Sequence, residues 1–315
     1  MEKQTLIEVD QISRFYGEHC AVNDVSFTVQ RGEVLGFLGP NGAGKSTTMQ
    51  IICGVQTAST GRVSIAGHDI FDEPAAAKSH IGFLPEIPPL YLDLTVDEYL
   101  AYAARLRRVA GADIAAAVDR ARSRCGLSDT GHRLIRNLSR GYRQRVGIAQ
   151  AIIHSPAVVI LDEPTSGLDP IQIREIRELI RELGNDHSVI LSTHILSEVQ
   201  TVCNRVLIIH QGRLVMDKAI AELEEQQHNV LNLSFLNPPG RDALLALDYV
   251  TDVEQTGAQS FRLRYAEGRS VHDDLCRAAM DNQWGLKAMT PQTHTLEETF
   301  LQLTQQDDTQ AGAGA

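Results

Sequence analysis

The sequence predicts an α/β fold with a parallel sheet buried on both faces, followed by a smaller α+β unit. Two uninterrupted apolar runs, residues 34–38 and 157–161, are typical of strands that are covered by helices on both sides. The first run leads into a glycine-rich loop, and the second ends in an acidic pair. A length of 315 residues exceeds one typical domain, so two domains are expected.

The glycine-rich loop, residues 39–47, satisfies the pattern G-x-x-x-x-G-K-[ST]. Its glycines let successive backbone N–H groups point into one concavity, and the following helix adds its positive N-terminal end, so the loop is predicted to bind phosphate. In this pattern Lys45 reaches the β- and γ-phosphates and the Ser46 hydroxyl ligates Mg²⁺. The alternative, a turn that binds nothing, is much weaker for a complete pattern after a strand. The predicted nucleotide-binding residues here are Gly39, Asn41, Gly42, Ala43, Gly44, Lys45, Ser46 and Thr47.

The acidic pair Asp162-Glu163 follows the second apolar run directly. Ligands bind at the carboxyl ends of strands in open α/β sheets, so this pair is expected near the phosphate loop. Asp162 is predicted to hold Mg²⁺, and Glu163 to orient and deprotonate the attacking water. Ordinary surface acids at a strand end are common, but the phosphate loop makes that interpretation the poorer one.

Composition and charge exclude several classes of protein. There are 40 acidic residues against 29 basic ones, and a net charge of −11 disfavours nucleic acid as the main partner. The five cysteines are scattered without a C-x-x-C pair, so neither a disulfide framework nor a zinc site is indicated and a reducing cytoplasm fits. We find neither a signal peptide nor an apolar run near the roughly 20 residues that span a bilayer.

Residues 138–145, Leu-Ser-Arg-Gly-Tyr-Arg-Gln-Arg, resemble the signature sequence of ATP-binding-cassette (ABC) ATPases, and they lie just upstream of the acidic strand as in that family. Ser139 at a helix start and the Gly141 backbone would offer donors and a positive helix end to a phosphate. In the family these donors serve the ATP of a partner subunit. Arg140 stands where glycine is usual, which crowds the phosphate site but adds a counter-charge.

Further matches follow in the order of the family. Tyr16 resembles the aromatic residue on which adenine stacks, and Asp169, in Ser-Gly-Leu-Asp, resembles the loop that crosses the dimer interface. His194 is similar to the histidine that contacts the γ-phosphate. Glu86 stands where many members place a Mg²⁺-contacting glutamine, and because a carboxylate also ligates Mg²⁺ we retain it as a metal candidate.

The resemblance implies a P-loop NTPase ABC cassette at residues 1–222, with a β-rich, RecA-like core and a helical subdomain at about 86–155. Thr95-Val-Asp-Glu is expected to cap a helix that runs through Arg108, and Gly126 to end the next helix.

Residues 223–306 are expected to form a small α+β accessory domain, ferredoxin-like in element order, with a disordered tail at 307–315. A closing helix near 296–300 resembles that of exporter-type subunits. The expected order is strand, helix, strand, strand, helix, strand at 230–235, 243–247, 250–254, 261–265, 273–280 and 286–289.

The resemblance thus implies an ATP-hydrolysing subunit that binds ATP and Mg²⁺, forms a homodimer and powers a separate membrane permease from the inner face of the cell membrane. Export is favoured, because the chain is similar to gliding-motility and related exporter-type ATPases at 141–144, 168–172 and the C-terminal extension. An importer subunit and a nucleic-acid-acting ABC ATPase are the alternatives. A non-hydrolytic regulatory binder would lack Glu163 or His194, and both are present.

Overall fold

The computed structural model describes residues 4–225, 230–266 and 271–291. The chain divides into two compact units, Met1–Ile220 and Ala221–Ala315, each with its own sheet and hydrophobic core. The division falls two residues before the predicted one. The predicted closing helix at 296–300 and the predicted disordered tail lie outside the described residues.

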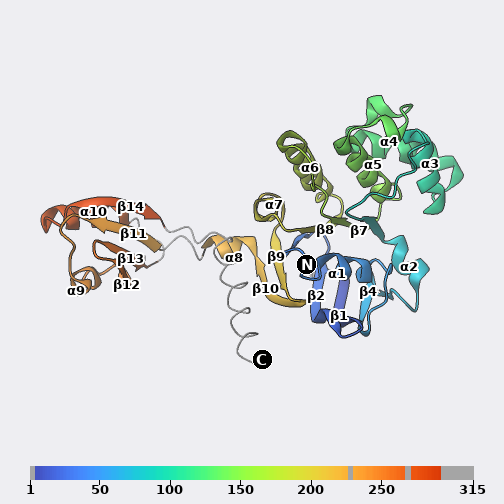
Figure 1. The fold of residues 1–315 in the computed structure, drawn as a ribbon. Helices are drawn as coiled ribbons and strands as arrows, with labels where there is room; N and C mark the ends of the chain where they lie inside the picture. The colour runs from blue at the N-terminus through green and yellow to red at the C-terminus, as the bar shows by residue number, and fades with distance from the viewer. Residues whose placement is uncertain (1–3, 226–229, 267–270, 292–315) are drawn as a thin grey trace. The chain divides into compact units, whose positions relative to one another are not determined.

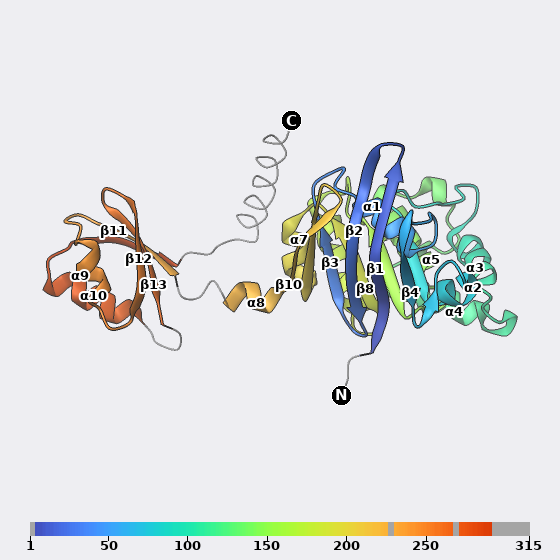
Figure 2. The ribbon, with the colours of Figure 1, turned by 90° about the horizontal axis from the view of Figure 1, so that it is seen from below.

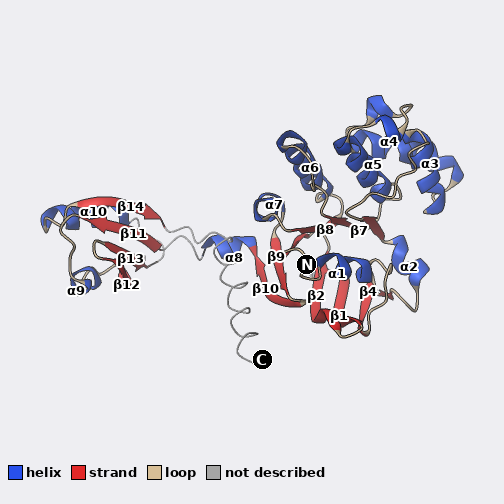
Figure 3. Ribbon diagram, in the orientation of Figure 1, coloured by secondary structure: helices blue, strands red, loops and turns tan. Residues whose placement is uncertain are grey.

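A six-stranded sheet forms the centre of the first unit (Figure 3). Its strands are β3 (Val34–Leu38), β6 (Ile81–Leu84), β7 (Val158–Asp162), β8 (Ser188–Thr193), β9 (Arg205–His210) and β10 (Arg213–Ala219). Their order is β10-β9-β3-β8-β7-β6, in which only the β9–β10 pair is antiparallel. Every residue of β3, β7 and β8 is buried, as their apolar sequences predict.

A second, four-stranded antiparallel sheet has the order β2-β1-β4-β5. Its strands are β1 (Thr5–Tyr16), β2 (His19–Gln30), β4 (Thr60–Ile65) and β5 (His68–Asp69). Helix α1 (Lys45–Ile52) lies between the two sheets and contacts strands of both (Figure 1). Met49, Ile51 and Ile52 of this helix join side chains from both sheets in one core, which fixes the phosphate loop at the start of α1.

Three helices, α3 (Val96–Leu106), α4 (Ile114–Arg124) and α5 (Arg140–Ile152), pack against one another in the predicted helical region. Thr95 and Glu98 form the predicted capping box at the start of α3. The helix ends at Leu106 and not at Arg108 as predicted, because Arg108 has a φ of 59°, which no α-helix can include. Gly126, with a φ of 65°, follows the end of α4 as predicted.

The remaining helices of the first unit are α2 (Pro74–Ser79), α6 (Pro170–Leu183) and α7 (Leu196–Val202), and α8 (Ile220–Glu225) begins at its last residue. Three 3₁₀ turns, Gly111–Asp113, Ser128–Thr130 and Ile135–Asn137, connect the helical region. Helix α7 packs against β3 (Figure 2). The approach is close, because a Cβ at Gly36 of β3 would lie 2.6 Å from the Val199 side chain. No helix in the described part of the chain is both long and apolar enough to span a bilayer.

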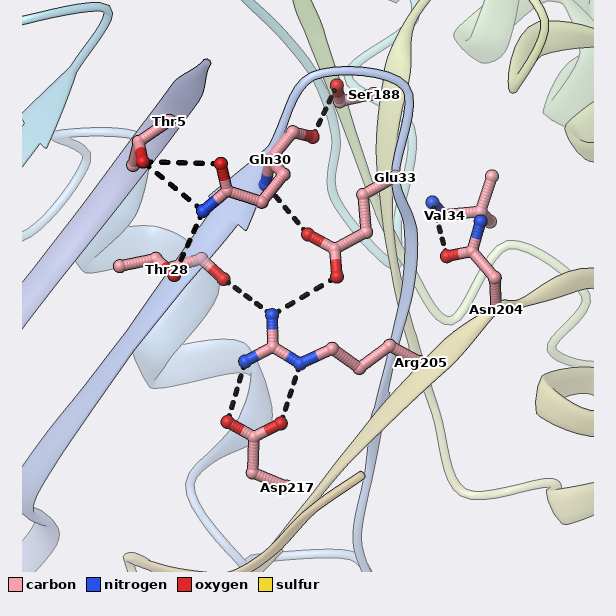
Figure 4. Close-up of polar contacts among 9 residues, drawn as sticks. All are labelled: Thr5, Thr28, Gln30, Glu33, Val34, Ser188, Asn204, Arg205 and Asp217. Carbon is pink, nitrogen blue, oxygen red and sulfur yellow. Dashed lines mark hydrogen bonds and ion pairs between the residues drawn. The ribbon is translucent and has the colours of Figure 1, made fainter. Parts of the chain in front are cut away.

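A cluster of polar contacts ties the two sheets of the first unit together at the start of β9 (Figure 4). The Arg205 guanidinium donates two hydrogen bonds of 2.6 Å to the Asp217 carboxylate. The same side chain donates to Glu33 at 3.1 Å and to the Thr28 carbonyl on β2 at 3.0 Å. Beside it, the Ser188 hydroxyl donates to the Gln30 carbonyl at 3.0 Å.

The second unit has a four-stranded antiparallel sheet with the order β12-β13-β11-β14. Its elements are β11 (Val230–Phe235), α9 (Arg241–Leu245), β12 (Val250–Gly257), β13 (Ser260–Tyr265), α10 (Val271–Asp281) and β14 (Leu286–Pro291). This is the predicted β-α-β-β-α-β order, and the strand order is that of a ferredoxin-like sheet. Leu231, Leu233 and Phe235 of β11 form the core with Leu275 of α10.

Candidate functional site: a phosphate-loop pocket

The loop between β3 and α1 curls around the side chain of Lys45. Gly42 and Gly44 have φ angles of 81° and 105°, which residues with a Cβ rarely adopt. A Cβ at Gly44 would also lie 2.4 Å from the Ala21 carbonyl oxygen. The Lys45 ammonium donates to the carbonyl oxygens of Gly39 at 2.9 Å and Pro40 at 3.2 Å. The loop therefore has the concave backbone that the sequence pattern predicts.

The loop opens into a pocket of about 320 Å³. Strand ends distant in the sequence contribute its other walls, so the phosphate loop and Glu163 share one cavity as predicted. Ser166 is a lining residue that the sequence analysis did not propose as a site residue. The pocket is lined by Asn41, Gly42, Gly44, Lys45, Ser46, Thr47, Glu86, Glu163, Ser166 and His194.

Glu163 occupies the centre of the polar contacts in this pocket. Its carboxylate lies 3.3 Å from the Lys45 ammonium, and its other oxygen lies 2.8 Å from Nδ1 of His194. Glu163 has a φ of 47°, and its backbone N–H donates to the Ser192 carbonyl at 2.9 Å. A left-handed conformation at a non-glycine residue carries strain, which the surrounding structure must hold in place. The carboxylate is thereby held against both a cation and an imidazole.

The predicted metal residues form a set of hard oxygen donors that suits Mg²⁺. Asp162, 2% exposed at the end of β7, accepts a hydrogen bond of 2.7 Å from the Ser192 hydroxyl. Ser46 and Glu86 line the pocket, whereas Asp162 is not one of its lining residues. The described residues include no cluster of three or more His, Cys, Asp or Glu side chains around one metal position. Mg²⁺ commonly uses only one or two carboxylates together with phosphate oxygens and water, so the residues fit the ion.

Comparisons with known proteins identify the family. The family model described as "ABC transporter" matches residues 22–166. The chain is 33% identical over 303 residues to the uncharacterized ABC transporter ATP-binding protein YhcH of Bacillus subtilis (strain 168), covering 96% of both chains. The chain belongs to the ABC transporter ATP-binding subunits. It is accordingly an ABC-type ATPase.

A second relative and a solved structure agree with this membership. The bacitracin transport ATP-binding protein BcrA of Bacillus licheniformis is 30% identical over 301 residues, which cover 95% of this chain and 97% of that protein. A solved ATP-binding subunit of an ABC transporter superposes with a TM-score of 0.64 at 33% identity, covering 70% of this chain and 93% of its own. The predicted cassette fold is therefore confirmed.

The signature of this ABC ATPase is not part of the pocket lining. Ser139 is the N-cap of α5 and accepts a hydrogen bond of 3.4 Å from the Tyr142 backbone N–H. A Cβ at Gly141 would lie 2.5 Å from the tip of the Gln172 side chain, which would have to move to accept it. Asp169 caps α6 by accepting from the N–H groups of residues 171 and 172 at 3.0 Å. Neither cap is a lining residue of the phosphate-loop pocket.

Tyr16 and two glycine-rich-loop residues also lie outside the pocket lining. Tyr16 ends β1 with 44% of its surface exposed, and its hydroxyl donates to Gln56. The Arg14 guanidinium lies 4.9 Å from the centre of the Tyr16 ring. Ala43 is buried, and the Gly39 carbonyl accepts a hydrogen bond from Lys45. Stacking of this partly exposed ring on adenine stays a prediction.

Several side chains that the sequence patterns did not indicate support the pocket from behind. Ser192 holds Asp162, while Thr165 and Thr193 both donate to Glu198, a fully buried carboxylate. Thr193 directly precedes His194 and Thr165 lies two residues after Glu163, and this proximity in the sequence is the one signal that could have found them. Burial also raises the pKa of the Cys53 thiol, with a further contribution from the Asp162 charge, so this cysteine is a neutral packing residue.

Proposed function

We propose that this ABC ATPase hydrolyses ATP as a homodimer and thereby powers a separate permease that exports its substrate. The proposal rests on the composition of the pocket, which contains the predicted catalytic residues of this chain but not its signature. Lys45, Glu163 and His194 meet in it, whereas the signature forms a different surface of the same chain. A second copy could supply that signature, since a symmetric dimer places equivalent surfaces against each other reciprocally.

In this proposal the chain's own residues divide the work of hydrolysis. The loop N–H groups and Lys45 bind the phosphates, and Glu163 accepts the proton of the attacking water. His194, already 2.8 Å from Glu163, orients that carboxylate and contacts the γ-phosphate. Ser46, Asp162 and Glu86 would hold Mg²⁺, which neutralises phosphate charge when bound.

The remaining predicted residues act across the dimer. Tyr16 stacks on the adenine of its own subunit's ATP, while Ser139 and Gly141 bind the phosphates held by the partner. Asp169 lies in the loop that crosses the interface. ATP closes the dimer by bridging the two subunits, and hydrolysis removes the bridge.

The proposal also includes the direction of transport and the position of the subunit in the cell. The resemblance to exporter-type subunits, including the gliding-motility kind, supports export, and so does the relative named for transport of bacitracin, which aligns over 95% of this chain. We infer that the subunit works at the inner face of the cell membrane, docked on the permease. An importer subunit is the second candidate, and identification of the membrane protein that co-purifies with the chain separates the two.

Mixing two inactive variants tests the head-to-tail dimer. Lys45→Ala disables the phosphate loop, and Ser139→Asp adds a negative charge at the signature while Asp still caps α5. In a mixed dimer one pocket combines the intact loop of one copy with the intact signature of the other. The equimolar mixture should therefore regain roughly a quarter of the wild-type ATPase rate, because half of the dimers are mixed and each has one intact pocket.

A matched mixture provides the control. It contains the Lys45→Ala variant and the Glu163→Gln variant, and both substitutions affect the phosphate-loop side of the pocket. No dimer in this mixture therefore contains an intact site, and the rate should stay at the level of the single variants. Recovery in this control, or no recovery in the first mixture while both variants are folded, would contradict the proposed dimer.

A further inference from the structure

A buried carboxylate behind the pocket joins the two segments that carry Glu163 and His194. Glu198, on α7, is 0% exposed. One of its oxygens accepts a hydrogen bond of 2.5 Å from the Thr165 hydroxyl, and the other accepts one of 2.7 Å from the Thr193 hydroxyl. Arg177 of α6 approaches the same carboxylate at 3.6 Å. Three other segments of the chain therefore converge on the carboxylate that α7 carries.

The two threonines that bind Glu198 lie close in the sequence to the predicted catalytic residues Glu163 and His194. Thr165 lies two residues after Glu163 and directly before Ser166, which lines the pocket. Thr193 directly precedes His194. The two threonine side chains are almost fully buried, at 2% and 0% exposure. Because both hydroxyls bind one rigid carboxylate group, the separation of their backbones is set by Glu198.

Burying a carboxylate costs several kcal/mol unless hydrogen bonds and a counter-charge compensate for it, so an apolar residue would serve packing better. An apolar residue could not orient two hydroxyl groups. We propose that Glu198 is a positioning residue that holds the Glu163 and His194 segments at the separation required for their 2.8 Å contact. This inference rests on the proposed catalytic role of that pair.

The test uses substitutions that preserve shape. Glu198→Gln retains the volume and removes the charge, while Thr165→Val and Thr193→Val each replace one hydroxyl by a methyl group. Small displacements of reacting groups lower the rate of the chemical step more than they lower substrate binding, so kcat should fall about 10- to 100-fold with the KM for ATP nearly unchanged. Thr130→Val, which removes a buried hydroxyl bonded to the Leu127 carbonyl outside the pocket, is the matched control and should leave kcat unchanged.

A double-mutant cycle separates positioning from general stability. If Glu198 acts through His194, Glu198→Gln should lower kcat in the wild type but have almost no further effect in a His194→Ala background. A full additional loss in that background, or an unchanged kcat in all three shape-preserving variants once folding is verified, would overturn the inference. Normal activity of His194→Ala and Glu163→Gln would instead refute the proposed function itself. If Glu198→Gln does not fold, the same double-mutant cycle with His194→Ala is measured for Thr165→Val and Thr193→Val.

Discussion

The two edges of the six-stranded sheet use polar side chains in opposite ways. At the carboxyl edge Lys45, Glu163 and His194 contact one another and line a cavity, although Lys45 also donates to two loop carbonyls. At the amino edge Arg205 is held by three fixed acceptors (Figure 4), and two histidines are bound to backbone carbonyls. Polar groups that face a cavity can still form hydrogen bonds with a ligand, whereas polar groups that are hydrogen-bonded within the protein stabilise the fold.

This contrast predicts that changes at the carboxyl edge alter activity and changes at the amino edge alter stability. The largest effect is expected for Glu163→Gln, which removes the base while the amide fills the same space. ATP turnover should fall by two to three decades or more, roughly 3 to 4 kcal/mol in the activation barrier, with nucleotide binding retained. Steady-state ATPase assays and ATP titrations measure both.

Glu182→Gln on the exposed face of α6 is the matched control for this substitution, and it should hydrolyse ATP at the wild-type rate. An unchanged rate in Glu163→Gln would show that Glu163 is not the base.

Arg205→Met at the amino edge should have the reverse outcome. Hydrogen bonds to Asp217 raise the pKa of Arg205 above its usual range, and its removal leaves the mostly buried Glu33 without its cation. We expect a loss of about 3 kcal/mol in the free energy of unfolding, with kcat unchanged in the folded fraction. Arg174→Met, whose side chain is 83% exposed, should change stability by less than about 0.5 kcal/mol. Urea unfolding of both variants decides the point.

The smallest expected effect is a loss of stability in acid at the same edge. Burial, reinforced by the Arg107 charge, lowers the pKa of His154 from 6.5 to about 4. The unfolded chain therefore binds a proton between these pH values that the folded chain does not, so stability falls as the pH drops through this range. This histidine should contribute a loss of about 2 kcal/mol between pH 7 and pH 5.

His154→Gln can still donate to the Ile81 carbonyl that His154 contacts at 3.1 Å, but it cannot take up a proton. The difference between variant and wild type in urea unfolding at the two pH values isolates the contribution of His154. Identical pH dependence in the two proteins would contradict the assignment. His187, whose pKa burial also lowers, remains in both proteins and cancels in the comparison.

Much of the architecture could be predicted because it depends on local patterns. Uninterrupted apolar runs identify β3 and β7, the glycine pattern identifies the loop that curls around Lys45, and the capping box identifies the start of α3. The element order of the second unit follows likewise from short alternating patterns. In each of these segments the residues that determine the conformation are neighbours in the sequence.

Tertiary structure decided what depends on residues far apart. The 2.8 Å contact of Glu163 with His194 joins strands 31 residues apart, and the sequence around Glu198 does not indicate that this carboxylate is fully buried. The position of Arg108 outside α3 likewise contradicts a favourable helical sequence. Sequence patterns report the preferences of the local backbone, whereas burial and contact depend on which surfaces the packed sheets and helices bring together.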